Sequence, residues 1–253
     1  MVSLNLPALQ VPPLNAHYEG EYDEQMLRWR EVCAKDKVSN IVSLLDANNA
    51  GRPEKVLEAG CGTAVVLLEM WRQRIGSFHH GADVADPADH PHPGVVEAGL
   101  ELAVSDGVRL PYDDDSFDLV FASHVLEHVP DERGFLSELK RVSRRWVYVE
   151  VPCEIVVRTS IGKLQSTLNI GHINSYTPET VALTLATAGL VPCDVQLFDH
   201  SMEVHAFHNS AARARIKAAV RRGLLKTNPT LASRLFAYHC GALVDLQAPQ
   251  NLN

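Results

Sequence analysis

Residues 56–63 have the sequence VLEAGCGT, in which an apolar run passes through an acidic residue into two glycines separated by one residue. The apolar run is typical of a buried strand, and VVLLEMWRQR at 65–74 follows it with helical spacing. Glycine lets the backbone bend tightly and approach a ligand, and the start of a helix offers N–H groups without a partner inside the helix. The stretch therefore predicts a strand, a ligand-binding turn and a helix, in that order.

Short apolar runs alternate with helical patterns on either side of this turn. The apolar runs are KVLEAGC, FHHGADVA, LELAVSDG, FDLVFAS and WVYVEVP, and the helical patterns among them are VVLLEMWRQR and FLSELKRVS. Such alternation indicates strand–helix units around a parallel sheet. We therefore predict an α/β core domain.

The segments around the core differ from it in pattern. Apolar residues recur at helical spacing over 22–45, which predicts one or two helices. We expect residues 1–50 to form an N-terminal helical cap or lid, and 51–209 to form the core. Within the core, residues 153–176 show no clear period, and we expect an inserted loop or lid there.

The C-terminal third contains a well-marked helix start. Thr177 and Pro178 supply an N-cap and a first-turn proline for a helix that ends at Gly189. DVQLF at 194–198 and EVHAF at 203–207 resemble two strands and predict a closing hairpin. Beyond it we expect helices over 211–225 and 229–246, the first with its arginines on a polar face, within a C-terminal helical segment 210–253.

Composition excludes several classes of protein. The 253 residues include 31 acidic and 23 basic ones, for a formal net charge of -8, so no basic field attracts nucleic acid or anionic lipid. Five cysteines without a C-x-x-C pair argue against a disulfide framework or a cysteine zinc site. No apolar run approaches the roughly 20 residues of a membrane helix, and the first residues lack a signal-peptide pattern. We therefore expect a cytoplasmic protein with neither nucleic-acid nor membrane partners.

Asp83 follows the glycine turn by about the interval at which nucleotide-binding folds place an acidic residue on a ribose. It stands at the predicted end of the second strand. A carboxylate there accepts hydrogen bonds from both ribose hydroxyls, which a neutral side chain does less well. Asp86 is a rival for this role, and a solvated aspartate at a strand end is the alternative interpretation.

Five segments resemble, in order, the motifs of the class I S-adenosylmethionine-dependent methyltransferases over about residues 55–190. They are VLEAGCGT, GADVA, SDGVRLPYDDDSFDLVFASHVLEHVPD, FLSELKRVSRRWVYVEVP and HINSYTPETVALTLATAGL. The resemblance implies a Rossmann-like sheet of seven mostly parallel strands with helices on both faces, closed by the hairpin and capped by N- and C-terminal helices. It also implies S-adenosylmethionine as cofactor, S-adenosylhomocysteine as product, and a small-molecule acceptor methylated on oxygen, nitrogen or carbon.

The same resemblance implies a set of cofactor-binding residues that lie after the ends of successive predicted strands. They are Glu58, Gly60, Cys61 and Gly62 for the methionine part, Asp83 for the ribose, Asp106 and Gly107 for the adenine, and Ser123 and His124 for the methionine end. The sequence departs from the family pattern in two places. Ala64 stands where a third glycine is frequent, and ADHPHPGVVEAG at 88–99 is interrupted by prolines where a regular helix is expected.

Methyl transfer from a sulfonium is an in-line displacement, so much of the rate enhancement comes from positioning the acceptor. A general base helps where the acceptor must lose a proton. The candidates are His172 and Tyr176 in GHINSYT, followed by His124 and His128. For each of them, a hydrogen-bonded structural side chain is the alternative.

A metal site is the competing interpretation of the histidines. His124, Glu127 and His128 match the H-x-x-E-H pattern of a zinc peptidase helix. The glycine turn and Asp83 have no role in a peptidase, however, and we predict no metal. A solvated loop is favoured over a metal site for a second group of histidines, namely His79, His80, His90 and His92.

Two other functions stay open at this point. A related enzyme would transfer the aminocarboxypropyl arm of the cofactor instead of its methyl group, or cyclise the cofactor itself. A regulatory or scaffold protein would bind the cofactor without turning it over. No motif indicates the acceptor or the oligomeric state.

Overall fold

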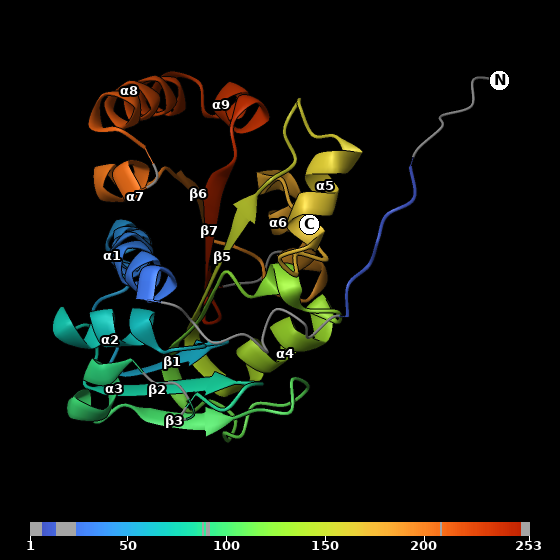
Figure 1. Cartoon of the computed structure of the whole chain (residues 1–253). Coiled ribbons are helices and arrows are strands. Elements are labelled where there is room, and N and C mark those ends of the chain that lie inside the picture. Colours follow the sequence, from blue (N-terminus) through green and yellow to red (C-terminus); the bar gives the residue numbers. More distant parts are fainter. Residues whose placement is uncertain (1–6, 14–23, 88, 90–91, 208, 249–253) are drawn as a thin grey trace.

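The computed structural model describes residues 7–13, 24–87, 89, 92–207 and 209–248 (Figure 1). This part of the chain contains a seven-stranded sheet with the strand order β3-β2-β1-β4-β5-β7-β6. The strands are β1 (Lys55–Ala59), β2 (Phe78–Asp83), β3 (Glu101–Val104), β4 (Phe117–Ser123), β5 (Ser143–Cys153), β6 (Asp194–Phe198) and β7 (Tyr238–Asp245). The helices are α1 (Glu24–Ala47), α2 (Val65–Arg72), α3 (Pro93–Ala98), α4 (Glu132–Val142), α5 (Ile161–Leu168), α6 (Pro178–Thr187), α7 (Met202–Phe207), α8 (Ala211–Thr227), α9 (Pro229–Leu235) and the short 3-10 helix η1 (Leu126–His128).

The sheet is buried on both faces. β1 pairs in parallel with β2 and β4, and β7 runs antiparallel between β5 and β6. Val56 packs in one apolar core with α1 and α2, whereas its neighbour Leu57 packs in a second core with α4 and α6. Figure 1 shows these two pairs of helices on opposite sides of the sheet. The predicted mostly parallel, seven-stranded α/β sheet with helices on both faces is confirmed.

The predicted closing hairpin is wrong in its second strand. EVHAF lies in α7, where Val204 and His205 are buried, and the antiparallel partner of β6 is β7. The helix expected over 229–246 correspondingly ends at Leu235. Residues 238–245 are almost entirely buried between two strands, and such a strand shows no alternation of polar and apolar residues. Its period therefore does not distinguish it from a buried helix.

The N-terminal helical pattern forms one helix rather than two. α1 runs over 24 residues and places Val38, Ile41 and Leu44 in the apolar core that it shares with α2. The described start of this helix lies beside a cavity, since Met26 and Trp29 line that cavity. No helix within the described segments combines the length and the apolar character needed to cross a membrane.

Three details concern the later helices. Thr177 caps α6 as predicted, with Thr180 completing a capping box. The segment expected to be a loop contains α5, whose start is capped by Ser160 Oγ. Arg221 of α8 is not on a polar face: it is buried, and its Nε donates to Asp199 Oδ1 at 2.6 Å.

Candidate active site

A cavity of about 870 Å³ opens at the carboxyl ends of β1, β2 and β4. Ligands of open α/β sheets bind at this edge, where the loops that follow the strands converge. The predicted site residues that line the cavity are Glu58, Gly60, Cys61, Gly62, Asp83, Gly107, Ser123, His124, His128 and His172. Asp106 and Tyr176 are not among the residues that line it.

The glycine turn has the geometry that the sequence predicts. Gly60 and Gly62 have φ angles of 78° and 51°, in the left-handed region that favours glycine. A Cβ atom on Gly60 would lie 2.5 Å from Val125 Cγ2, so no larger residue fits there without a shift. Beyond the turn, Thr63 Oγ1 lines the cavity wall and is buried without a hydrogen-bond partner among the described residues. A polar ligand would satisfy this hydroxyl.

Asp83 ends β2, as predicted, and its carboxylate is held in place by the backbone. Gly62 N donates to Oδ2 at 2.7 Å and Ala85 N donates to Oδ1 at 3.1 Å. Each carboxylate oxygen accepts more than one hydrogen bond, so both can also accept from a ligand. Asp86 also lines the cavity but is exposed, whereas Asp83 is only 9% exposed. The structure therefore favours Asp83 over its rival as an oriented ligand.

Glu58 is a carboxyl group buried at the end of β1. Its Oε2 accepts a hydrogen bond from Leu67 N at 3.1 Å, and the side chain is 3% exposed. Burial raises the pKa of Glu58 to about 8, against the opposing effects of Lys37 and of the Leu67 hydrogen bond. The group is therefore mostly protonated at neutral pH in the ligand-free protein. A cationic ligand group beside it would favour the ionised form.

Glu58→Gln is expected to stabilise the ligand-free chain at high pH. The unfolded carboxyl loses its proton near pH 4.5, whereas the folded one keeps it to about pH 8. The folded state therefore binds more protons in this window, and stability falls as the pH rises through it. This loss is absent in the variant, whose amide oxygen still accepts from Leu67 N. A gain of about 2–3 kcal/mol near pH 9 would raise the melting temperature by roughly 5–10 °C.

Melting curves of both proteins from about pH 5 to pH 9 check this expectation. The two melting temperatures should lie close together near pH 5 and separate as the pH rises. Parallel curves over the whole range would show that Glu58 does not carry the shifted pKa.

Asp106 and Gly107 form the turn after β3. Val108 N and Arg109 N donate to Asp106 Oδ1 at 2.8 and 2.7 Å, and these hydrogen bonds lower the pKa of Asp106. The carboxylate is exposed and shapes the turn, while Gly107 contributes to the cavity wall. Of the two residues predicted to contact the adenine, only Gly107 lines the cavity.

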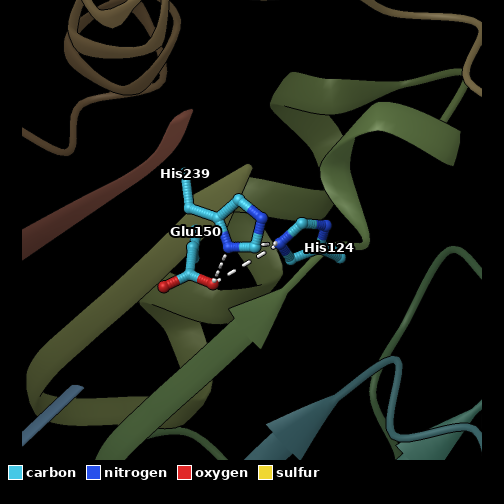
Figure 2. Close-up of side chains that lie close together, drawn as sticks. All are labelled: His124, Glu150 and His239. Atoms are coloured by element: carbon cyan, nitrogen blue, oxygen red, sulfur yellow. Dashed lines mark hydrogen bonds and ion pairs between the residues drawn. The ribbon is translucent and has the colours of Figure 1, made fainter. Parts of the chain in front are cut away.

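His124 follows β4 with a φ of 61°, a left-handed conformation that is uncommon for residues other than glycine. Its Nε2 lies 3.4 Å from Glu150 Oε1 and 3.3 Å from His239 Nδ1 (Figure 2). Its Nδ1 lies 3.3 Å from Glu127 Oε1. Glu150 belongs to β5 and is fully buried. Burial of the His239 imidazole lowers its pKa. The neighbouring His200 also lines the cavity, and burial lowers its pKa to about 3.

His172 and His128 form a second group of imidazoles at the cavity wall. His172 Nδ1 lies 2.8 Å from Glu154 Oε2, and His128 Nδ1 lies 3.0 Å from Gly171 O. The two rings pack edge to face with centroids 4.9 Å apart. A carboxylate on one ring nitrogen orients the imidazole and leaves the other nitrogen to accept a proton. His172 and Glu154 therefore have the arrangement of an oriented base.

Tyr176 is buried behind the same loop instead of facing the cavity. Its hydroxyl donates to Leu126 O at 3.2 Å and to Glu132 Oε1. These contacts attach the loop to η1 and α4. They are typical of a residue that holds the loop in place rather than of one that meets a ligand.

Tyr176→Phe is expected to lower the free energy of unfolding by about 1–3 kcal/mol, because it removes a hydrogen bond to a partly buried carboxylate. Chemical denaturation of the variant and of the wild type measures this difference. A variant as stable as the wild type would contradict the structural role of the hydroxyl.

The H-x-x-E-H pattern does not form a metal-binding helix. The positive φ of His124 precedes a single 3-10 turn, so His124 and His128 do not share a helix face. They contact different groups, with His239 and Glu150 beside the first and Gly171 beside the second.

The other histidines predicted to form a solvated loop contact different groups. His79 contacts Ile75 O, His80 contacts Glu101, and His92 contacts Glu31. His79 and His80 lie in strand β2, and His79 is buried, so the solvated-loop interpretation is wrong for these two residues. His90 lies outside the described residues.

Glu150, His239 and Lys37 are among the site residues that sequence reasoning missed. Glu150 could have been found from the sequence, because a single acidic residue inside the apolar run WVYVEVP indicates a buried carboxylate. His239 had no such signal, because its segment was expected to be helical. Lys37 on α1 lines the cavity and donates to Ser123 O at 3.2 Å, but a lysine on a helix carries no specific signal.

Comparison with known proteins gives a family and a fold. A family model described as a methyltransferase domain matches residues 22–194. Demethylmenaquinone methyltransferase of Corynebacterium glutamicum is 36% identical over 95 residues, covering 36% of this chain and 37% of that protein. Methyltransferase GfsG of Streptomyces halstedii is 30% identical over 138 residues, covering 48% of this chain and 49% of that protein. The chain thus spans between a third and a half of the length of these curated relatives.

Two solved structures share the fold. A SAM-dependent methyltransferase from Aquifex aeolicus superposes with a TM-score of 0.52 at 16% identity, over 88% of this chain and 94% of that one. Magnesium protoporphyrin IX methyltransferase from Synechocystis, solved with bound SAH, superposes with a TM-score of 0.52 at 14% identity, over 92% of this chain and 90% of that one. At these identities the likeness concerns the arrangement of helices and strands.

Proposed function

Since this chain belongs to the methyltransferase domain family, we propose that it transfers a methyl group from S-adenosylmethionine to an oxygen, nitrogen or carbon atom of a small molecule. One observation carries the proposal furthest. The carboxylate of Asp83 is fixed by the N–H of Gly62, so that the acidic residue and the glycine turn form a single preorganised wall of the cavity. Such a wall suits a ribose joined to a polar tail.

The residues present fit the cofactor. When bound, S-adenosylmethionine supplies a methyl group activated by its sulfonium. Asp83 accepts hydrogen bonds from the ribose hydroxyls, and the Thr63 hydroxyl gains the partner that it lacks among the described residues. Glu58 in its ionised form pairs with the ammonium of the methionine part. Gly107 leaves room for the adenine beside the turn after β3.

On the acceptor side we assign the proton-accepting role to His172. Glu154 holds its Nδ1, so its other ring nitrogen is the one available to take a proton from an acceptor hydroxyl or amine. The cavity walls keep water from the reacting atoms and hold the acceptor in line, which accounts for much of the rate enhancement in a displacement of this kind.

Three observations support a small acceptor. The cavity of about 870 Å³ lies in the range of small-molecule sites. The net charge of -8 disfavours nucleic acid, and the curated relatives are named for small acceptors such as demethylmenaquinone and norajmaline.

All five cysteines are free, in keeping with the reducing cytoplasm that we propose as the location of the protein.

Calorimetry and product analysis test the proposal. The chain is expected to bind S-adenosylhomocysteine and S-adenosylmethionine without added metal. Methyl-labelled cofactor is then incubated with panels of quinols, amines and polyketide alcohols, and the label should appear in one class of acceptor. No heat with either ligand at millimolar concentration would contradict the cofactor assignment. Cofactor consumption in the absence of any acceptor would contradict methyl transfer and favour cyclisation.

A further inference from the structure

Three potential ligand atoms meet at one point of the cavity wall. His124 Nε2, His239 Nδ1 and Glu150 Oε1 lie 3.3, 3.4 and 3.4 Å from one another (Figure 2). The sheet register fixes this meeting, because His239 of β7 stands opposite Pro152 of β5, two residues from Glu150 on the same face. His124 enters from the end of the neighbouring strand β4, with its N–H donating to Glu150 O at 2.8 Å. From this arrangement we propose that the three side chains bind one zinc-class divalent cation.

The distances fit a coordination site better than a hydrogen-bonded cluster. An N–H···O hydrogen bond is usually 2.7–3.2 Å long, so contacts of 3.4 Å are long for direct hydrogen bonds. Two ligands at about 2.0–2.1 Å from a tetrahedral ion are about 3.3–3.4 Å apart. All three sides of the triangle have this length. An ion placed between the three atoms would therefore lie at bonding distance from each of them.

The surroundings orient the ligands toward this point. Tyr148 OH and Asn40 Nδ2 donate to the other oxygen of Glu150, Oε2, at 2.6 and 2.9 Å. On Oε1 the remaining described donor is Ser123 Oγ at 3.3 Å. The other ring nitrogen of His124 faces Glu127 Oε1 at 3.3 Å, so the imidazole stands between a carboxylate and the proposed ion. This carboxylate–histidine–metal order is the usual outer arrangement of protein metal sites.

Charge also favours a cation. Glu127 and Glu150 are both fully buried, and neither oxygen of Glu127 has a hydrogen bond of ordinary geometry among the described residues. Lys37 contributes one positive charge nearby. Burying carboxylates is costly unless cations lie beside them, and a dication between the ligands offsets this cost.

The ligand set and its exposure indicate the class of metal. Two imidazoles and one carboxylate suit zinc and neighbouring first-row ions rather than calcium or magnesium. Both histidines line the cavity while Glu150 lies behind them, so the open side of the triangle faces the cavity. Three protein ligands with one open position are typical of a catalytic rather than a structural zinc site. If the proposed function holds, the open position is where an acceptor oxygen would be polarised.

Metal titration of the untagged full chain tests the site directly. After treatment with a chelator, the chain is titrated with Co²⁺, and the expected result is one bound ion per chain with the visible bands of a low-coordinate Co²⁺ site. Zn²⁺ should displace it. His239→Ala is expected to weaken Zn²⁺ binding by at least about 100-fold, and Glu127→Gln by about 10- to 100-fold through the loss of the partner of His124.

Two further variants make the test specific. His239→Cys exchanges a nitrogen ligand for a thiolate and should add a sulfur-to-cobalt charge-transfer band, which reports contact with the ion independently of any loss of stability. His200→Ala is the matched control, since this ring lies 4.4 Å from that of His239 and lines the same cavity without entering the triangle. Its Zn²⁺ affinity should stay within about twofold of the wild type.

Several outcomes would overturn the site. These are no binding at micromolar metal, an equal loss in His200→Ala, or binding that survives His239→Ala but disappears in His172→Ala. The last result would place the ion in the neighbouring group of Glu127, His128 and His172. Binding of S-adenosylhomocysteine is measured on the same chelator-treated chain, so a failed metal site and a failed cofactor assignment are told apart.

Discussion

Replacing His172 with alanine is expected to lower turnover by about 100- to 10 000-fold, the range for loss of a general base. Its imidazole lines the cavity and is oriented by Glu154, whose Oε2 lies 2.8 Å from His172 Nδ1. The cofactor contacts that we assign come from the ends of β1 and β2 on other segments. Affinity for S-adenosylhomocysteine should therefore change by no more than about twofold.

Glu154→Gln is the informative companion variant. It keeps a hydrogen-bond acceptor for His172 Nδ1 but removes the charge that stabilises the imidazolium, so turnover should fall less than in His172→Ala. Turnover, cofactor affinity and melting temperature are measured on the same preparations. Unchanged turnover in His172→Ala would remove this residue from the reaction, and a parallel loss of melting temperature and turnover would indicate a structural role.

Asp83→Ala is expected to weaken binding of S-adenosylhomocysteine by about 1.5–3 kcal/mol, or roughly 10- to 150-fold. Two effects combine in this variant. The ribose hydroxyls lose a charged acceptor, and Gly62 N loses the 2.7 Å hydrogen bond that holds the glycine turn against β2. Calorimetry at one pH and salt concentration measures the change.

Asp86→Ala is the matched control, because this aspartate lines the same cavity three residues later but is exposed. It should cost much less affinity than Asp83→Ala. The reverse order would show that the ribose ligand is Asp86. Asp83→Asn separates the two contributions, since its amide oxygen can still accept from Gly62 N while the charge is lost.

Much of the nucleotide side of the site was predictable from local patterns. Residues 60 and 62 adopt left-handed φ angles that glycine takes without strain, and the interval to Asp83 is set by one helix, α2, and one strand, β2. Such features are encoded within about 30 residues, which is the length of one strand–helix–strand unit. They were therefore visible before any tertiary contact was known.

The acceptor side was only partly predictable. His172 lines the cavity as expected, whereas Tyr176 four residues later points into the core and bonds to Glu132. Both are polar residues in one loop without a periodic pattern, and the direction of a side chain there depends on what packs against it. The sequence therefore identified the loop that reaches the cavity, but it could not show which polar residue of that loop faces the cavity.

The amino-acid sequence alone determined the α/β class, the order of the first five strands along the chain, the glycine turn and the position of Asp83. These features depend on strand and helix periods and on glycine conformations, which are local properties. Only the tertiary structure decided the position of β7 in the sheet and the contact among His124, Glu150 and His239. The two histidines are 115 residues apart, and they become neighbours because β7 inserts between β5 and β6 in one particular register. A histidine specifies no partner by itself, so this group exists only once the sheet has paired its strands.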